Sequence, residues 1–359
     1  MLIETGYQVP EKPDTLITHH ILADSQEQMW LLFQSHYRSL AFGTSGDGGR
    51  TWSPARELLS DISGPFSYFT GAGKNLYVVA RKTHPPDIHL ITWDGEKWSE
   101  GTIFTASGKQ VLTSQPLIIE DSNSLVHIVF ALRGYTSAEW NIKHLMIDLT
   151  KGKMTGCSVP ALSEPSPGFP ARFDFLKEVL YWSGSLLIDS ENGLHLACRS
   201  FSEGHYHIFY SSYNNATGKW NNLLPLTKTP FHRGNPGMIT GSDGKSIYVV
   251  FNVEEDTGYN MVCLSRDPGG NWSKQRVLGS EIKNDTPPVL VKTPTGPLAY
   301  WADGYGISRA FLEVNHPTKR VFTEKVSSLS AAFAGGRVLL ACTGLSQGKN
   351  RILLAEDYI

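Results

Sequence analysis

The sequence has little of what metal, redox and membrane proteins require. Its 359 residues include only four cysteines, and no two of them form a C-x-x-C pair. Such pairs are the usual signature of zinc and thiol-redox sites, so we predict neither a metal nor a cofactor. The apolar runs around Cys198, Cys263 and Cys342 instead predict buried free thiols. No apolar run reaches the roughly 18 residues that a membrane-spanning helix needs.

Charge of one sign is not in excess either. Lys and Arg number 32 against 34 Asp and Glu, which gives a net charge of −2. Non-specific nucleic-acid binding needs a basic surface, so we expect neither nucleic acid nor a membrane as a partner. Residues 1–7 show no basic region followed by an apolar core, which is the pattern of a secretory leader. We therefore expect a cytoplasmic protein, or a secreted one if a leader has been removed.

Two octets of the same pattern stand out in this otherwise ordinary composition. Ser45–Trp52 and Ser265–Trp272 both read S-x-D-x-G-x-[TN]-W. Short Ser and Asp side chains bond nearby backbone groups and Gly accepts unusual dihedral angles, which predicts a tight turn between antiparallel strands. The Trp is expected to fill the gap between neighbouring sheets. The pattern resembles the Asp-box, or BNR repeat, of the sialidase-like β-propellers, where the box lies on the face away from the active site.

Further units of a polar turn followed by an apolar strand recur along the chain. They begin at Asp24, Asp121, Asp189 and Ser242, and each has the signature of a hairpin. Asp24 and Asp121 are separated by two repeats of about 48 residues, a spacing typical of propeller blades. We therefore predict one all-β domain over residues 1–359. It forms a seven-bladed propeller of four-stranded antiparallel blades, with six blades as the alternative.

Two segments depart from the regular repeat. The last blade shows only three strands before the chain ends, whereas Met1–Val9 reads as a spare strand. Pairing of Ile3–Tyr7 with Ile352–Glu356 would complete that blade and remove an exposed sheet edge. The 163–183 segment lengthens one repeat by about 20 residues and is predicted to be an inserted loop or short helix. Such an insert is either decoration or a lid over a binding site.

Arginine recurs at the end of the second strand in three successive blades, as Arg81, Arg133 and Arg199. If the octets join the third and fourth strands, these ends lie on the opposite face, around the central channel. Guanidinium groups offer paired donors to carboxylate or sulfate, so we predict an anionic ligand there. The alternative is that each Arg pairs with an acid of a neighbouring blade. Further ligand-binding candidates on this face are Tyr135, Trp140, Arg172, Glu203 and Arg233.

Aromatic and ionisable side chains accompany these arginines, as sugar recognition requires. His36, Tyr37, His205 and Tyr206 supply acid and base groups on the same loops, and we predict them as catalytic residues. His205 and His207 fall on one face of a strand, as metal co-ligands would. The sequence places no third ligand beside them, so no metal is predicted.

The resemblance to sialidase-like propellers concerns the fold more than one activity. True sialidases carry an Arg-Ile-Pro motif near the first blade, where this sequence reads LITHHI at 16–21. Some seven-bladed propellers that this chain resembles are polysaccharide lyases, in which His and Tyr act as base and acid and Arg neutralises a uronate. The resemblance thus implies a propeller that acts on or binds an acidic saccharide, by lyase or glycoside hydrolase chemistry. A non-catalytic glycan-binding or protein-interaction propeller is the alternative.

Overall fold

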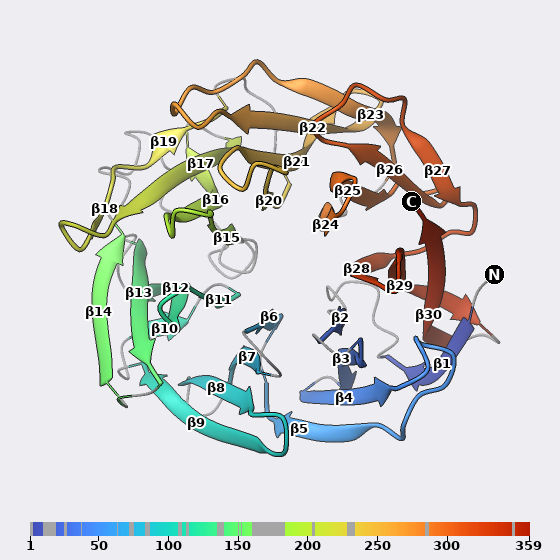
Figure 1. Ribbon diagram of the computed structural model, residues 1–359, viewed down its shortest axis with the longest axis horizontal. Helices are drawn as coiled ribbons and strands as arrows, with labels where there is room; N and C mark the ends of the chain where they lie inside the picture. Colours follow the sequence, from blue (N-terminus) through green and yellow to red (C-terminus); the bar gives the residue numbers. More distant parts are fainter. Residues whose placement is uncertain are drawn as a thin grey trace.

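The computed structural model is a ring of seven antiparallel sheets around a central axis (Figure 1). The predicted seven-bladed propeller is therefore confirmed. The structure describes residues 3–9, 19–24, 27–36, 38–62, 64–71, 75–82, 87–106, 110–112, 115–134, 140–149, 151, 153–159, 184–202, 205–227, 234–283, 287–346 and 349–359. In this part of the chain no helix is long and apolar enough to cross a bilayer. The insert predicted at 163–183 lies outside the described residues.

The blades follow one another along the chain, and each runs from the axis outward. Blade 1 consists of β2 (His19–Ala23), β3 (Met29–His36), β4 (Ser39–Ser45) and β5 (Arg56–Ser60). Blade 2 consists of β6 (Ser67–Thr70), β7 (Leu76–Arg81), β8 (Asp87–Trp93) and β9 (Trp98–Thr105). In blade 3, β10 (Gln110–Leu112) and β11 (Leu117–Glu120) both pair with β12 (Leu125–Gly134), which is followed by β13 (Trp140–Asp148) and β14 (Lys153–Val159).

The remaining blades keep this order. Blade 4 has β15 (Gly184–Ile188), β16 (Leu194–Ser202) and β17 (His205–Asn214), with β18 (Lys219–Trp220) and β19 (Leu224–Pro225) both on β17. Blade 5 has β20 (Gly237–Thr240), β21 (Ile247–Glu255), β22 (Gly258–Arg266) and β23 (Arg276–Ile282). Blade 6 has β24 (Val289–Thr293), β25 (Gly296–Ala302), β26 (Ile307–Phe311) and β27 (Lys319–Phe322). Blade 7 has β28 (Ser328–Ala334), β29 (Arg337–Ser346), β30 (Lys349–Tyr358) and β1 (Ile3–Gln8).

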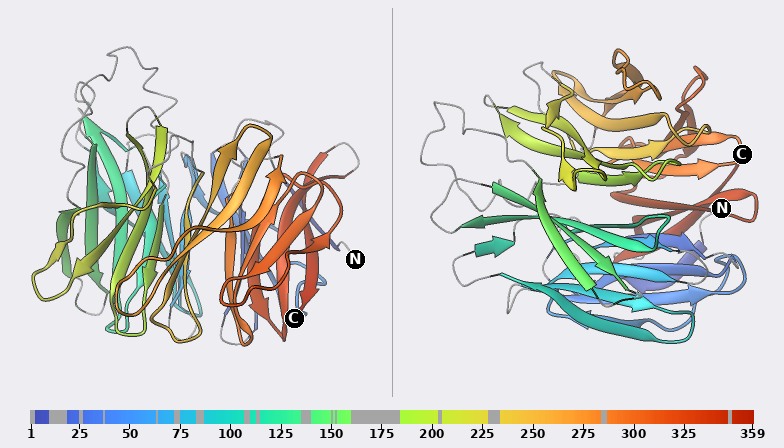
Figure 2. Two further views of the ribbon diagram at one scale, coloured as in Figure 1. Left: turned by 90° about the horizontal axis from the view of Figure 1, so that it is seen from above. Right: turned by 60° about the vertical axis from the view of Figure 1, so that its left-hand side comes forward.

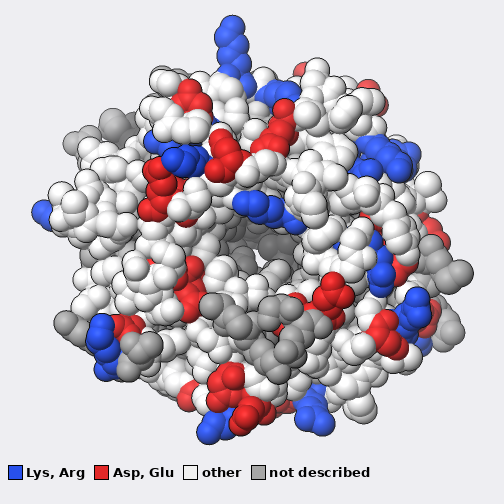
Figure 3. Space-filling view, viewed as in Figure 1, with Lys and Arg blue, Asp and Glu red and all other residues white. Residues whose placement is uncertain are grey.

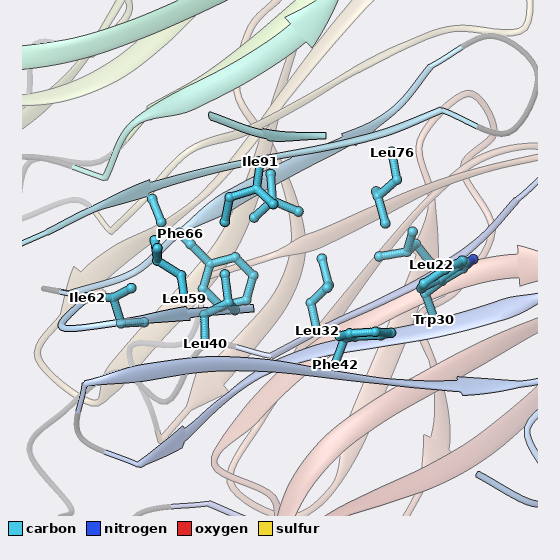
Figure 4. Close-up of a cluster of buried hydrophobic side chains, with 12 residues drawn as sticks. Leu22, Trp30, Leu32, Leu40, Phe42, Leu59, Ile62, Phe66, Leu76 and Ile91 are labelled. Atoms are coloured by element: carbon cyan, nitrogen blue, oxygen red, sulfur yellow. The ribbon is translucent and has the colours of Figure 1, made fainter. Parts of the chain in front are cut away.

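The hydrophobic core lies between the blades. In the described part of the chain, each of the seven junctions between neighbouring sheets holds one cluster of buried apolar side chains. Figure 4 shows the cluster between blades 1 and 2, where Leu32 and Phe42 of one sheet face Leu76 and Ile91 of the next. Because both faces of a blade are covered in this way, the second strands are mostly apolar, as in Leu76–Arg81, where only the last residue is charged.

The ring closes through the N-terminal strand, as predicted. In blade 7, β1 pairs antiparallel with β30, with Ile3 opposite Leu354 and Glu4 opposite Leu353. Arg351 reinforces the pairing with an ion pair to Glu4 at 2.7 Å. The strand from the start of the chain therefore covers the edge that the end of the chain would otherwise expose.

Tyr7 fastens the closing strand to blade 1 as well. Its ring stacks on Phe33 with centroids 4.7 Å apart, and its hydroxyl donates to the Ser53 carbonyl. The ring fits only because residue 43 is glycine, since a Cβ there would lie 1.7 Å from the Tyr7 hydroxyl oxygen. The closing strand thus joins two blades, one through its backbone and the other through this side chain.

Both octets form the tight turns that the sequence predicts. In the first, Asp47 Oδ1 accepts the Thr51 amide at 2.9 Å, and its Oδ2 accepts the Thr51 hydroxyl at 2.6 Å. These bonds, with one from the Ser45 hydroxyl, hold the pKa of Asp47 well below its ordinary value. In the second octet, Asp267 Oδ1 accepts the Asn271 amide at 2.8 Å.

Tryptophan side chains near the start of the fourth strands fill the gaps between sheets. Each contacts the preceding blade: Trp52 meets Tyr7 of blade 7, Trp98 meets Trp30 and Phe42 of blade 1, Trp220 meets His144 of blade 3, and Trp272 meets Tyr210 of blade 4. The octets contribute two of these tryptophans, and the shorter turns before β9 and β18 contribute the others. The expectation for the octet tryptophans is therefore confirmed, and it extends to turns without the full pattern.

A buried chain of hydrogen bonds joins blades 3 and 4. Trp220 Nε1 donates to His144 Nδ1 at 3.1 Å, so the His144 proton lies on Nε2 and is donated to His127 Nδ1 at 3.0 Å. His127 Nε2 then carries its proton toward Asp121 Oδ2, which is 3.5 Å away. At the next junction, His195 lies between Asp189, at 2.9 Å, and the Tyr210 hydroxyl, at 2.7 Å.

Prediction of packing. Replacing Gly43 by Ala should lower the free energy of unfolding by about 1–3 kcal/mol, because the added methyl group displaces Tyr7 and loosens the closing strand. Gly101→Ala is the matched control, since that glycine also lies in a strand but has nothing within 4 Å of the added atom. Chemical denaturation measures both. Equal losses in the two variants would contradict the role of Tyr7.

Prediction of acid sensitivity. Burial lowers the pKa of His19 to about 3, of His144 to about 3 and of His20 to about 4. Each is neutral in the fold, whereas the unfolded chain takes up a proton below pH ~6.5. Stability is therefore complete above pH ~6.5 and falls as the pH drops, by about 1.4 kcal/mol per unit for each such histidine. Thermal unfolding between pH 7.5 and 4.5 should show this fall, and a constant midpoint would contradict it.

Candidate functional site

The connections between strands divide the molecule into two faces. The octets join β4 to β5 and β22 to β23, the third and fourth strands of their blades, as expected. We call their side the octet face. We call the opposite side, with the turns from second to third strands and the connections between blades, the mouth face. The edge-on view in Figure 2 shows the sheets running between these two faces.

The three repeated arginines all lie toward the mouth face, near the ends of their second strands β7, β12 and β16. Arg133 stands opposite Trp140 in the backbone register of blade 3, and His205 and Tyr206 begin β17 of blade 4. For four predicted residues the structure describes the backbone but not the side chain: His36, Arg133, Trp140 and His205. Five others lie outside the described residues: Tyr37, Tyr135, Arg172, Glu203 and Arg233. For these residues the assignment stays a prediction.

Arg199 and Tyr206 come together within blade 4. The Arg199 guanidinium lies over the Tyr206 ring, 4.7 Å from its centroid, and Arg199 is only 5% exposed. The neighbouring strands β16 and β17 bring the two residues together, since Phe201 is the backbone partner of Tyr206. Stacking on the ring holds the guanidinium in place. The arrangement sets a fixed positive charge over the ring of a phenol.

Arg81 occupies a partly buried position in blade 2. Burial lowers the pKa of its guanidinium to about 10, so the group remains charged at neutral pH. It lies against Gly64 in the connection from blade 1, where a Cβ would approach Nη2 to 3.2 Å. Gly64 also has a φ of 75°, which glycine adopts without strain.

The first strands bring further residues to the mouth face that the sequence analysis passed over as functional. His19 contacts two hydroxyls of blade 7, with Nδ1 3.0 Å from Ser330 Oγ and Nε2 2.9 Å from Ser328 Oγ. His20 packs against Tyr68, whose pKa burial raises to about 12. The enclosed Nε2 of His20 has no hydrogen-bond partner among the described residues. The sequence places both histidines at the start of a first strand. Because first strands lie nearest the axis, that position could have marked them as candidates.

In blade 6 the two described arginines are already paired with acids. Asp303, in the turn after β25, accepts Ser308 Oγ at 2.7 Å and Arg320 Nη2 at 3.0 Å. Burial by itself would raise the pKa of Asp303, but the hydrogen bonds from Ser308, the Tyr305 amide and Arg320 outweigh it and lower that pKa. The arginines of this blade are therefore in ion pairs at the rim and do not form an open anion site.

The described cysteines and acidic residues form no metal-binding group. Cys198, Cys263 and Cys342 are free and buried, as predicted, and burial raises the pKa of each thiol to about 12. Within the described ranges no three His, Cys, Asp or Glu side chains gather in a way that would hold a metal ion. The described part of the mouth face thus contributes guanidinium, imidazole and phenol groups to the candidate site.

The charge of the surface is mixed. Figure 3 shows one face of the ring, with a hollow in the middle and acidic and basic side chains interspersed around it. The net charge of the chain is only −2. No excess of one sign is therefore visible on the face that Figure 3 shows.

Comparison with known proteins finds similarity in structure only. No family model matches the sequence, and no curated protein matches it. A PL25 ulvan lyase superposes with a TM-score of 0.64 at 9% identity, covering 99% of this chain and 95% of that one. The GH93 α-L-arabinofuranosidase of Fusarium graminearum gives 0.54 at 14% identity, covering 82% and 92%. The SapL1 lectin with α-methyl fucoside gives 0.52 at 12% identity, covering 86% and 96%.

These structural neighbours are carbohydrate-active or carbohydrate-binding propellers. At such low identities the likeness establishes the fold of this chain and no particular activity, because propellers host many functions.

Proposed function

We propose that this protein recognises an acidic saccharide at the mouth face and cleaves it by elimination. The observation that carries the proposal is the pair of Arg199 and Tyr206, a buried guanidinium fixed against a phenol. In the same proposal the two octets are Asp-boxes of the sialidase-like propellers. That assignment places the ligand on the opposite face, where this pair lies.

Binding depends on the arginines of the mouth face. A carboxylate or sulfate group accepts paired hydrogen bonds from a guanidinium, and such charge-assisted bonds are stronger than neutral ones. Arg81 and Arg199 belong to blades 2 and 4, with Arg133 of blade 3 between them in the order of the ring. A ligand that engages several of these arginines must span more than one blade. We therefore expect an oligosaccharide with repeated acidic groups.

Elimination needs only groups that this face supplies. A base removes the proton at C5 of a uronate, the C4–O bond breaks, and a C4=C5 double bond forms while the departing oxygen takes up a proton. As the phenolate, Tyr206 can accept the first proton and then return it to the departing oxygen, with His205 as the second acid–base candidate. Arg199 stabilises the negative charge that develops on the carboxylate during proton removal.

The structural neighbours favour a saccharide ligand. One of them, the PL25 ulvan lyase, is seen bound to -[GlcA(1-4)Rha3S]-, a ligand that carries both carboxylate and sulfate groups. The lectin neighbour, which binds a fucoside, supports the second candidate, namely binding without cleavage. The two candidates share the ligand site and differ only in the chemical step.

Prediction of binding. Arg199→Ala should weaken binding of uronate-containing oligosaccharides by about tenfold or more, because one charge-assisted bond contributes roughly 1.5–3 kcal/mol. Arg50→Ala is the matched control, because it removes the same charge from an exposed site on the octet face. Titration calorimetry on ligands chosen from a glycan array measures both. Binding by the wild type should also weaken as salt is added. Equal affinity of the two variants would refute the mouth site.

Prediction of chemistry. Tyr206→Phe should leave oligosaccharide binding within about threefold but slow elimination by about 10²–10⁴, the usual contribution of a general base. The readout is the ultraviolet absorbance of the unsaturated uronate. Tyr305→Phe is the control, since it removes a hydroxyl from an exposed tyrosine in blade 6. If the wild type binds but produces neither this absorbance nor new reducing ends, the chain is a binding protein and the elimination step is wrong.

A further inference from the structure

A second cleft lies at the outer edge of blade 6, away from the axis. It has a volume of about 530 Å³ and is formed by β26, β27 and the turn that joins them. Its walls include Arg309, Phe311, His316, Pro317, Lys319 and Arg320. The joining turn belongs to the octet face, because it connects a third strand to a fourth.

The cleft is basic, and its innermost cation is held in place. Arg309 is 8% exposed and donates to Asp357 Oδ2 of blade 7 at 2.5 Å. Tyr300 donates to the same oxygen at 2.9 Å. The guanidinium carbon of Arg309 also lies 5.6 Å from the centre of the Phe311 ring. A buried arginine held by Asp357 and packed near Phe311 presents its remaining surface to the cleft with little freedom to lose on binding.

The charges around the cleft do not cancel. Asp357 pairs with Arg309, and Asp303 pairs with Arg320 through Nε and Nη2. Lys319 is exposed and makes no ion pair with a described residue. None of the lining residues is acidic. One positive charge is therefore left over at the cleft, and it is carried on a flexible side chain that can reach an anion.

One wall of the cleft is apolar and aromatic. The ring of His316 meets the ring of Phe311 edge to face, with centroids 5.7 Å apart, and Pro317 follows in the same turn. A flat apolar face beside cations suits a sugar ring that bears an acidic group, because the ring stacks while the charge is paired.

The turn that forms this wall is anchored by blade 5. Arg276 of β23 donates to the Leu312 carbonyl at 2.6 Å and to the Phe311 carbonyl at 3.2 Å. The Thr318 hydroxyl donates to the Leu278 carbonyl of the same strand. The cleft is thus formed before any ligand arrives, as small-molecule sites usually are, and its volume lies within their usual range of about 300–1,000 Å³.

We propose that this cleft is a second ligand site, which takes a sulfate or carboxylate group carried on a sugar ring. Lys319 pairs with the acidic group beside the fixed guanidinium of Arg309, and His316 and Phe311 contact the ring. The site is built from residues of blade 6 with support from blades 5 and 7, and none of the mouth-face candidates contributes to it. The proposed cleft site is therefore independent of the proposed elimination.

The experiment titrates the full chain with a sulfated monosaccharide, with glucuronate and with inorganic sulfate. We expect the Lys319→Ala variant to bind the acidic sugar about five- to tenfold more weakly than the wild type. The His316→Ala variant should bind it about threefold more weakly. Both side chains are exposed, so the variants should fold normally. Lys325→Ala, which removes an exposed lysine beyond the end of β27, is the matched control and should change nothing. The same titrations are run in the Arg199→Ala background, which removes the contribution of the mouth face to binding.

The outcomes are distinct. Weaker binding in the Lys319 and His316 variants, with the Lys325 control unaffected, would support the site. Inorganic sulfate that binds as tightly as the sulfated sugar would overturn the role of the aromatic wall. Equal binding by the wild type and Lys319→Ala, or no binding of any acidic sugar once the mouth is disabled by Arg199→Ala, would overturn the proposal. Because the mouth site is tested with long oligosaccharides and with Arg199, failure of one site is distinguishable from failure of the other.

Discussion

The whole structure depends on burial of apolar surface between neighbouring sheets. A single four-stranded blade has two apolar faces and cannot cover either by itself, so each blade is stable only between two others. Seven junctions with one buried cluster each satisfy this need only if the ring closes. The closing strand supplies that condition, and Tyr7 in the space above Gly43 fastens it to the first blade. The contact between the two ends of the chain therefore supports every other junction.

Equivalent positions at different junctions hold side chains of different chemical types. Between blades 1 and 2 they hold Trp30, Phe42 and Trp98, which pack as rings. Between blades 3 and 4 the equivalent places hold His127, His144 and Trp220, linked by hydrogen bonds. A buried polar chain is stable only when each donor has an acceptor, and here the sequence of donors ends on Asp121. The polar chain adds to the acid sensitivity of the fold, because burial keeps His144 neutral.

The arginines of this molecule have different roles, and each role depends on the groups that the guanidinium contacts. Arg199 is stacked on Tyr206, and Arg81 lies against Gly64. Arg309 and Arg320 are paired with carboxylates, and Arg276 binds carbonyls of the next blade. The first two lie near the ends of second strands, toward the mouth face where the proposed saccharide binds. The paired arginines of blade 6 instead shape a separate cleft in which Lys319 supplies the unbalanced charge.

Strand and turn chemistry is local, so the sequence by itself determined the propeller: the repeat of turns and apolar runs, the octet turns bonded by Asp47 and Asp267, and the spare strand at Ile3–Tyr7. It also placed Arg81 and Arg199 on the face away from the octets, because strand order fixes the end of each strand. Only the tertiary structure decided that Arg199 meets Tyr206, that Arg309 is held by Asp357 of the next blade, and that His19 meets Ser328 and Ser330 across the closed ring. Those contacts join residues distant in sequence, and their partners are set by how whole sheets pack around the axis rather than by any local pattern.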